Sequence, residues 1–385
     1  MYWLLLLTGI PYLYILLRVY KNLRKLKPFT PEAVPEAVPE LFISVIVACR
    51  NEEANLPFLL GNIAAQDYPS GLFEVIVVDD NSTDKSPDIA SGFSGIRNLR
   101  VYTNRGSGKK AAVRTGVAEA HGNLIVAVDA DSRMKPEWLR TIVSFREKEK
   151  SDMIICPVIL EAEGKGLFMR FQELEFLGLQ AVTAGSAQAG DPLMCNGANL
   201  FFTKESFERH AFSLHDELAS GDDIFLLHSM KADGSSRISW LESADARIRT
   251  SAVSSVTGFL KQRKRWISKA GSYSDFSTKL TALSTLTVVV LQASAFIAAF
   301  AASRFMLLFA AVFLVKSSAD YLVLRNTAVR YGKKSLMKWF IPSQLIYPFY
   351  VIAVAGCALA DRNRNRTLKT GDADPDLENK KRRAG

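Results

Sequence analysis

The sequence predicts an α/β protein in which a mostly parallel β-sheet, covered by helices on both faces, is joined to transmembrane helices. Short runs rich in β-branched residues alternate with helical stretches from residue 41 onward, which is typical of a parallel sheet. Long apolar segments lie near both ends of the 385-residue chain. That length leaves room for one large or two ordinary domains.

An almost wholly apolar segment, residues 2–17, lies close to the N-terminus. A cleaved signal peptide is the alternative to a membrane anchor here. No basic stretch precedes the segment and no Ala-x-Ala-like site follows it, whereas basic residues come directly after it: Arg18, Lys21, Arg24, Lys25 and Lys27. Because positive charge marks the cytoplasmic side, we expect residues 1–27 to be an uncleaved anchor with an outer N-terminus and a cytoplasmic domain after it.

Residues 28–40 are expected to form an extended linker, because prolines recur there at a spacing that resists helix formation. The domain that follows, residues 41–257, begins with four predicted strands at 41–48, 73–80, 99–103 and 123–131. Beyond them we expect a helix over 165–180 and a loop of small residues within 184–203.

Three further apolar segments near the C-terminus are each long enough to cross a bilayer, and together they occupy residues 279–361. A basic, partly amphipathic helix at 258–278 precedes them and is expected to lie at the membrane interface. An outer N-terminus and four crossings would put the basic tail, residues 362–385, outside, against the positive-inside tendency. Since Pro342 and Pro348 break the last segment, it could be re-entrant or interfacial, and three or four crossings remain possible.

The net charge of +9 is concentrated near the membrane flanks and in the tail. We expect it to attract anionic lipid and not nucleic acid, because no nucleic-acid-binding motif accompanies it. The 4 cysteines are far apart and form no CxxC pair, so they predict neither a zinc site nor a disulfide framework.

Three of the predicted strands end in polar clusters, which brings carboxylates to one edge of the sheet, where parallel sheets bind ligands. Asp129 and Asp131 end the fourth strand two residues apart, so both side chains can face one point. Paired hard oxygens suit Mg²⁺ or Mn²⁺, which in turn binds phosphate oxygens. Alone, the pair could equally be a solvated strand end.

Two further clusters fit a nucleotide. Asp79 and Asp80 follow the second strand, where one polar residue could cap the next helix and one carboxylate could accept hydrogen bonds from a base or ribose. Lys109 lies in a glycine-containing stretch, residues 104–116, that could hold phosphate. Its spacing is not that of a P-loop, and the alternative is an ordinary loop with a solvated lysine.

The remaining motifs could act on a second substrate that carries a hydroxyl group. Asp222 and Asp223 could simply begin a helix, or Asp223 could act as a general base. Gln262, Arg265 and Trp266 are spaced to share one helix face. Tryptophan beside a bilayer is usually an interfacial anchor, but here the indole could support a sugar ring while the neighbouring guanidinium stabilises a departing diphosphate.

Together these blocks resemble the family 2 inverting glycosyltransferases with a GT-A fold, particularly the membrane-embedded hyaluronan, chitin and cellulose synthases. Seven blocks occur in the family's order over residues 41–270: SVIVACRNEEANL, VIVVDDNSTD, GKKAAVRTG, DAD, CNGANLFF, GDD and QRKRW. The resemblance implies transfer of a sugar from a nucleotide-diphosphate sugar, with a UDP-sugar expected, to a hydroxyl of a growing polysaccharide or lipid-linked glycan. It also implies Mg²⁺ or Mn²⁺ as cofactor and a bacterial inner (plasma) membrane with the catalytic domain in the cytoplasm.

The resemblance further implies roles for the donor-side residues. Asp80, with Glu52 nearby, matches the residue that reads uracil and ribose, and Lys109 matches a lysine near the nucleotide. Asp129 and Asp131 match the metal motif, in which Asp131 is favoured as the direct ligand.

On the acceptor side, Asp223 matches the aspartate that deprotonates the acceptor hydroxyl. Gln262, Arg265 and Trp266 match the QxxRW motif, which is associated with the acceptor end, the diphosphate and processive members. Two departures stand out: Asp222 replaces a glutamate common in the family, and the membrane crossings are fewer than in the large synthases.

Two other functions were weighed. Haloacid-dehalogenase-like phosphohydrolases also place a DxD pair after an apolar strand, but here the pair comes late in the α/β region and QxxRW would have no role. A catalytically silent nucleotide-sugar-binding scaffold of the same fold is the other possibility, although all the expected carboxylates are present. The sequence names neither the sugar nor the acceptor, the degree of processivity or the oligomeric state.

Overall fold

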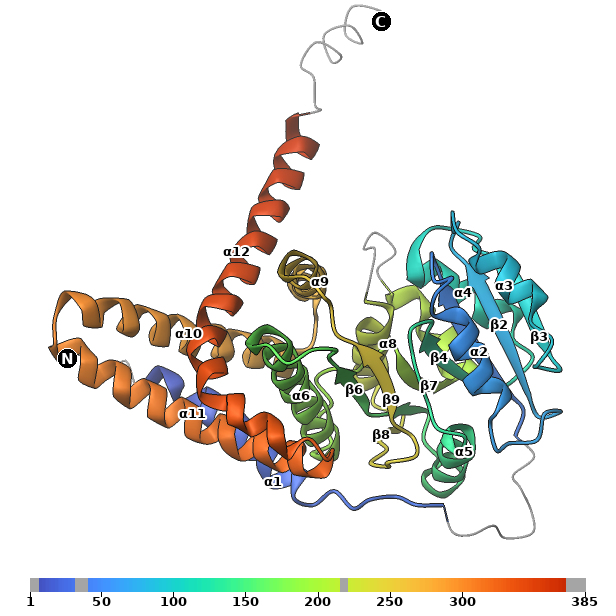
Figure 1. Ribbon diagram of the computed structural model, residues 1–385, viewed down its shortest axis with the longest axis horizontal. Helices are drawn as coiled ribbons and strands as arrows, with labels where there is room; N and C mark the ends of the chain where they lie inside the picture. Colours follow the sequence, from blue (N-terminus) through green and yellow to red (C-terminus); the bar gives the residue numbers. More distant parts are fainter. Residues whose placement is uncertain (1–6, 32–40, 215–220, 372–385) are drawn as a thin grey trace, which may run out of the picture.

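The computed structural model describes residues 7–31, 41–214 and 221–371, with the backbone alone described beyond residue 361 (Figure 1). The first residues of the predicted anchor, most of the predicted linker and the end of the basic tail lie outside the described residues. The α/β domain and the long helices form two parts that lie side by side, with α6 and α9 between them (Figure 1).

A central sheet of seven strands confirms the predicted α/β class. Its order is β3-β2-β1-β4-β7-β5-β8. The first four strands are parallel and match the predicted ones closely: β1 (Ile43–Cys49), β2 (Phe73–Asp79), β3 (Leu99–Thr103) and β4 (Leu124–Asp129). The others are β5 (Met153–Ile155), β7 (Asn199–Thr203) and β8 (Ile238–Trp240), of which β7 runs antiparallel to both its neighbours. A separate parallel pair consists of β6 (Val158–Glu161) and β9 (Ile248–Ser251).

Helices cover both faces of the sheet because successive strand residues point to opposite sides. Ile46 of β1 packs in one apolar cluster with Val113, whereas Val45 and Val47 pack in another with Leu60. The helices of this domain are α2 (Leu56–Ala64), α3 (Ser86–Gly92), α4 (Gly108–Glu119), α5 (Trp138–Glu149), α6 (Leu167–Gln188), α7 (Lys204–His210), α8 (Asp222–Asp233) and α9 (Val256–Ser268). Short 3-10 turns follow at Ala211–Ser213, Ala270–Ser272 and Lys334–Trp339.

The prediction of a loop of small residues within 184–203 is wrong at both ends of that range. Helix α6 continues to Gln188, and the segment closes with strand β7. The small residues allow α6 to pack closely against the N-terminal helix: a Cβ on Gly185 would lie 2.8 Å from the carbonyl oxygen of Val19. Small side chains here therefore mark a helix contact and not a loop.

Three helices in the described residues are long and apolar enough to cross a membrane, at 276–301, 304–330 and 334–361. The first two are α10 (Phe276–Ala301) and α11 (Arg304–Arg330), which form an adjacent pair. The third lies mostly in α12 (Phe340–Gly371), which rises across that pair in Figure 1. Pro342 and Pro348 were expected to break the last segment, but α12 is continuous through both. Pro342 lies at the start of the helix, where a missing N–H is tolerated, and Pro348 lies inside it.

The N-terminal helix α1 (Ile10–Leu23) begins later than the predicted anchor and includes Arg18 and Lys21. Its 14 residues are fewer than the roughly 20 that span a bilayer, so the extent of the anchor remains a prediction. Tyr12 donates a hydrogen bond of 2.6 Å to Asp320 on α11, and Lys316 pairs with the same carboxylate at 2.7 Å. These contacts join α1 to α11 and keep the two buried charges paired.

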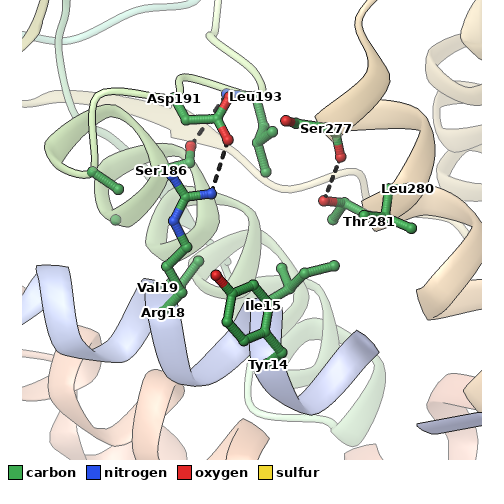
Figure 2. Close-up of a pocket in the computed structure, with 12 residues that line it drawn as sticks. Tyr14, Ile15, Arg18, Val19, Ser186, Asp191, Leu193, Ser277, Leu280 and Thr281 are labelled. Atoms are coloured by element: carbon green, nitrogen blue, oxygen red, sulfur yellow. Dashed lines mark hydrogen bonds and ion pairs between the residues drawn. The ribbon is translucent and has the colours of Figure 1, made fainter. Parts of the chain in front are cut away.

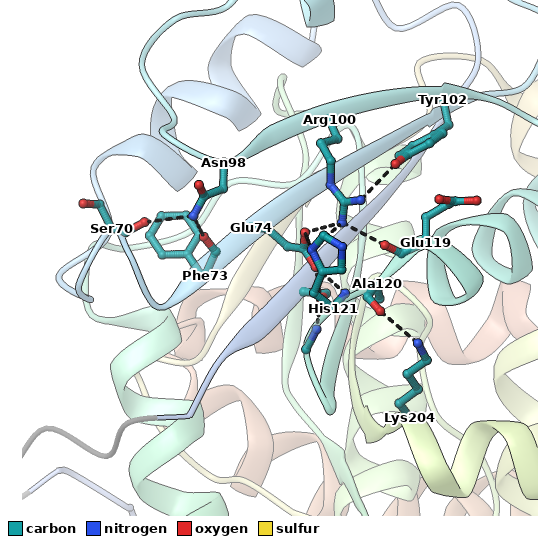
Figure 3. A network of polar contacts seen from close by, with 12 residues as sticks. Ser70, Phe73, Glu74, Asn98, Arg100, Tyr102, Glu119, Ala120, His121 and Lys204 are labelled. Carbon is teal, nitrogen blue, oxygen red and sulfur yellow. Dashed lines mark hydrogen bonds and ion pairs between the residues drawn. The ribbon is translucent and has the colours of Figure 1, made fainter.

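At the amino ends of the strands a different carboxylate is fully enclosed by the chain (Figure 3). Glu74 of β2 accepts hydrogen bonds from the Ser44 hydroxyl at 2.6 Å and the His121 backbone N–H at 2.7 Å, and it pairs with Arg100. Burial alone would raise the pKa of Glu74, but these donors lower it. This edge of the sheet is thus satisfied internally, in contrast to the carboxyl edge.

Candidate functional site

The strand register brings the predicted carboxylates to one edge of the sheet. Asp79 of β2 pairs with Cys49 at the end of β1, and Asp129 of β4 pairs with Ala48 on the other side. Because β1 lies between β2 and β4, the two clusters lie on either side of the carboxyl end of β1. The predicted polar edge is therefore present.

Asp80 organises the entrance of α4. It is buried, and it accepts hydrogen bonds from the Gly108 backbone N–H at 2.9 Å and from the Asn104 side chain at 2.6 Å. The Arg50 guanidinium lies 3.4 Å from its other oxygen. The predicted base or ribose reader is thus already bonded to the loop that carries Lys109.

Asp79 serves partly as the cap that the sequence allowed. One of its oxygens accepts a hydrogen bond of 3.1 Å from the Ser82 backbone N–H. Its other oxygen is buried and has no hydrogen-bond partner in the described residues.

Glu52 lies toward the metal motif. Asn55 donates a hydrogen bond of 2.9 Å to its carboxylate. Burial raises the pKa of Glu52, and the negative charges of Asp131 and Asp129 raise it further. The structure therefore brings Glu52 near the DxD pair, as expected for a shared nucleotide site.

Lys109, at the start of α4, forms an ion pair with Asp129, at the end of β4. Burial would lower the pKa of Lys109, but the neighbouring Asp129 and Asp222 raise it, so the lysine stays charged. Lys109 lies in the first turn of α4 and not in a loop, and its binding of phosphate stays a prediction.

The DxD pair offers two oxygen-donor side chains. Thr250 on β9 donates a hydrogen bond of 2.6 Å to Asp131, and burial together with Asp129 raises the pKa of Asp131. A divalent cation would relieve this repulsion. No group of three metal-ligating side chains occurs in the described ranges.

Asp223 lies in the first turn of α8, in a basic environment. Its carboxylate accepts a hydrogen bond of 3.0 Å from the Gly197 backbone N–H, and the ammonium of Lys269 lies 3.8 Å away. Burial would raise the pKa of Asp223, but Lys269 and Lys109 outweigh that effect and lower it. Asp223 is therefore ionised at neutral pH, as a general base must be.

Asp222 behaves differently from its neighbour. Burial and the adjacent charge of Asp223 raise its pKa. The pKa values of the two carboxylates are thus shifted in opposite directions.

Gly197 lies next to both Lys109 and Asp223. A Cβ at this position would lie 3.3 Å from an Asp223 oxygen and 3.3 Å from the Lys109 ammonium. The general-base candidate and the lysine of the DxD pair are therefore next to each other, although they are far apart in the sequence.

The QxxRW residues are arranged less uniformly than their spacing predicts. Trp266 is partly buried with its ring centroid 6.3 Å from that of Phe176 on α6, whereas Arg265 is exposed. Gln262 accepts a hydrogen bond from Arg263. In the part of the chain that is described, no ion pair joins Arg265 to the acidic residues, so its diphosphate role stays a prediction.

Several residues of the site were missed from the sequence. Lys269 lies just beyond QRKRW, and its basic surroundings gave no reason to single it out. Gly197 lies in the CNGANLFF block, but its contact with Asp223 depends on the fold, and the contact of Thr250 with Asp131 has no local pattern that identifies it.

Comparisons with known proteins concern the family and the fold of this chain. The family model described as Glycosyl transferase family 2 matches residues 44–210. A beta-monoglucosyldiacylglycerol synthase of Nostoc sp. is 34% identical over 113 residues, covering 28% of this chain and 24% of that protein. An undecaprenyl-phosphate 4-deoxy-4-formamido-L-arabinose transferase of Aeromonas hydrophila is 38% identical over 105 residues, covering 26% of this chain and 32% of that protein. The match thus spans a third or less of these curated relatives.

Among solved structures, a mannosyltransferase from Pyrobaculum calidifontis in complex with GDP-Man and Mn²⁺ is similar in fold. It has a TM-score of 0.57 at 20% sequence identity, and the match covers 86% of this chain and 99% of that one. Residues 44–210 of this chain are therefore similar to the Glycosyl transferase family 2, and the chain has the GT-A fold.

Proposed function

We propose that this protein is an integral membrane enzyme that transfers a sugar, with inversion, from a nucleotide-diphosphate sugar to an acceptor hydroxyl. The expected donor is a UDP-sugar, and the expected acceptor is a growing polysaccharide or lipid-linked glycan at a bacterial inner membrane. The observation that carries the proposal is that Asp223 and Lys109 both adjoin Gly197. This proximity supports the proposal that a base and a phosphate-binding cation act close to each other.

Asp223 acts as the general base in this proposal. As the acceptor oxygen attacks the anomeric carbon, its proton passes to Asp223 and the bond from that carbon to the diphosphate breaks. Attack from the side opposite the diphosphate inverts the configuration. General-base help of this kind is worth about 10² to 10⁴ in rate.

The donor is bound by the groups on the other side of Gly197. Lys109 places a positive charge beside the diphosphate, and Asp80 positions the loop that carries Lys109. Asp131, with Asp129, would hold Mg²⁺ or Mn²⁺, which offsets the charge on the departing nucleotide. The neighbour that contains GDP-Man and Mn²⁺ supports a nucleotide sugar with a divalent ion.

The proposed acceptor is held at the membrane, and a small cleft lies beside the candidate membrane helices (Figure 2). Tyr14 and Ile15 of α1 and Leu280 of α10 contribute apolar walls, while Arg18 reaches Asp191 at 2.9 Å. The cleft does not include Asp129, Asp131 or Asp223. Its lining residue Leu193 lies four residues before Gly197, on the same loop. The names of both curated relatives include a lipid, which agrees with this arrangement.

The proposal is tested by incubating membranes that contain the full-length chain with radiolabelled UDP-sugars and GDP-sugars, with Mg²⁺, Mn²⁺ or a chelator. We expect one UDP-sugar to label a product, which solvent extraction and sizing then classify as lipid or polymer. Asp223→Asn should abolish transfer while UDP binding is retained. Transfer by this variant at the wild-type rate would refute the base assignment.

The same assay separates the other functions. A phosphohydrolase would release phosphate from generic phosphoesters without sugar transfer. A silent scaffold would bind a nucleotide sugar and leave it intact in every condition.

A further inference from the structure

We infer that Arg263 is a positioning residue, which fixes Trp266 and Gln262 of the QxxRW motif and connects them to the membrane helix α12. The inference rests on the proposed function, because it takes these motif residues to contact the acceptor. Arg263 lies within QRKRW but is not one of its three defining residues.

Arg263 is held by a bidentate ion pair. Its side chain is 3% exposed, and that of its partner Glu175 on α6 is 7% exposed. The Nε atom of Arg263 lies 3.1 Å from one Glu175 oxygen, and Nη2 lies 2.7 Å from the other. Such a planar fork is specific to arginine, because a lysine ammonium cannot reproduce two parallel hydrogen bonds.

The same guanidinium contacts two of the three motif residues. Its carbon lies 4.1 Å from the ring centroid of Trp266, and Nη1 donates a hydrogen bond to Gln262. On another side it lies 4.6 Å from the ring centroid of Phe259, one helix turn earlier. Arg263 therefore restricts the orientation of the indole that is proposed to face the acceptor.

Glu175 also bonds to α12. The Tyr350 hydroxyl donates a hydrogen bond of 3.0 Å to the same carboxylate. The Tyr350 ring stacks on Phe259, with centroids 5.3 Å apart and planes at 29°. One buried cluster, formed by Arg263, Glu175, Tyr350 and Phe259, thus joins the motif helix, α6 and a candidate membrane span.

Lys264 provides a matched control on the same helix. It also contacts α12, through an ion pair with Asp361, but its side chain is 37% exposed and its partner 53% exposed. Exposed pairs of this kind contribute little, whereas removing one partner of a buried pair leaves a buried charge unpaired. The two positions carry the same formal charge and differ in burial and in contact with the motif.

The experiment compares Arg263→Gln, Arg263→Lys and Lys264→Gln in the full-length protein, in membranes and after purification. For both Arg263 variants we expect the acceptor kcat/KM to fall by about tenfold or more, because misplaced contacts are costly in catalysis. The donor KM should stay near the wild-type value. Lys264→Gln should leave both parameters unchanged.

A second readout reports on Trp266 directly and needs no turnover. Acrylamide quenching is measured for each protein and for its Trp266→Phe counterpart, and the difference gives the accessibility of Trp266. We expect Trp266 to be more accessible in both Arg263 variants than in wild type. In Lys264→Gln its accessibility should be the same as in wild type. A merely stabilising residue would leave Trp266 unchanged in the protein that remains folded.

Tyr350→Phe keeps the inference testable if the Arg263 variants do not fold. It removes one hydroxyl, so the fold should persist while the acceptor KM and Trp266 accessibility rise by a smaller amount. Wild-type acceptor KM and wild-type quenching in Arg263→Gln, or in Tyr350→Phe if that variant alone folds, would overturn the inference. Absence of sugar transfer by the wild-type protein would instead refute the proposed function, with the quenching data still deciding the geometry.

Discussion

The ammonium group of Lys269 lies 3.8 Å from a carboxylate oxygen of Asp223, across the start of α8. Lys269 follows the motif helix α9, whereas Asp223 lies in the first turn of α8, so this contact joins the QxxRW region to the general-base candidate. It lowers the pKa of this partly buried carboxylate. The contact has a direct consequence for the pH dependence of the proposed reaction.

Replacing Lys269 by Gln should move the acidic limb of the kcat/KM profile to higher pH. Lys269 lowers the pKa of Asp223, so without it the carboxylate takes up a proton at a higher pH and the base is lost sooner as the pH falls. The measurement is sugar transfer across a pH series, with Lys261→Gln, an exposed position on the same helix, as control. An unchanged acidic limb would mean that Asp223 is not the titrating base.

Lys109→Gln should weaken UDP binding about ten- to hundredfold, the usual range for a lost hydrogen bond to a charged group. Its raised pKa means that the lysine is charged throughout the assay range. Calorimetry on the purified protein provides the dissociation constants. Arg105→Gln, at an exposed arginine of the same loop, should bind UDP normally, and equal binding by both variants would contradict the role of Lys109.

Thr250→Val should raise the Mn²⁺ concentration needed for half-maximal activity by about tenfold, as loss of a hydrogen bond to a metal ligand does. The hydroxyl of Thr250 orients Asp131 at 2.6 Å, and valine has nearly the same shape without the donor. Metal titration of transfer, together with Mn²⁺ electron paramagnetic resonance in the presence of UDP, measures the change. Thr287→Val on α10, which removes only a bond to a helix carbonyl, is the control. If Thr250→Val and Thr287→Val need the same Mn²⁺ concentration for half-maximal activity, the assignment of Asp131 as a metal ligand is contradicted.

Glu74→Gln should lower the free energy of unfolding at pH 7 by about 1.5–3 kcal/mol, the range for hydrogen bonds to a charged group. Because the folded-state pKa of Glu74 is lowered, its stabilising contribution is present above the unfolded value of about 4.3 and is lost as the pH falls through the folded pKa. The difference in Tm between the variant and wild type should therefore shrink in acid.

Thermal unfolding in detergent at pH 7 and in acid tests this difference. Glu205→Gln, whose side chain is 80% exposed, should have the wild-type Tm at both values. A Tm difference for Glu74→Gln that does not change with pH would exclude an electrostatic origin.

Local sequence patterns were sufficient for much of the fold. The β-branched runs predicted β1 to β4, because burial on both faces of a parallel sheet leaves a nearly continuous apolar signature. The same reasoning placed Asp129 at the end of β4. It failed where one local pattern has two meanings, as in the small residues around Gly185, which serve helix packing.

The proline residues of the last segment illustrate the same limit. Pro348 lies inside α12 without ending it. The cost of a proline in a helix depends on which neighbours satisfy the freed carbonyl, and the sequence does not specify those neighbours.

The sequence by itself determined the α/β class, the carboxylates at the strand ends and the apolar segments, because each depends on residues close together in the chain. Only the tertiary structure decided that Lys109 and Asp223 both lie next to Gly197, that Lys269 lies beside Asp223, and that the Arg263 guanidinium packs on Trp266. Those relations depend on electrostatics and hydrogen bonds between segments far apart in the sequence. Such interactions require distances of a few ångströms, and folding alone sets those distances.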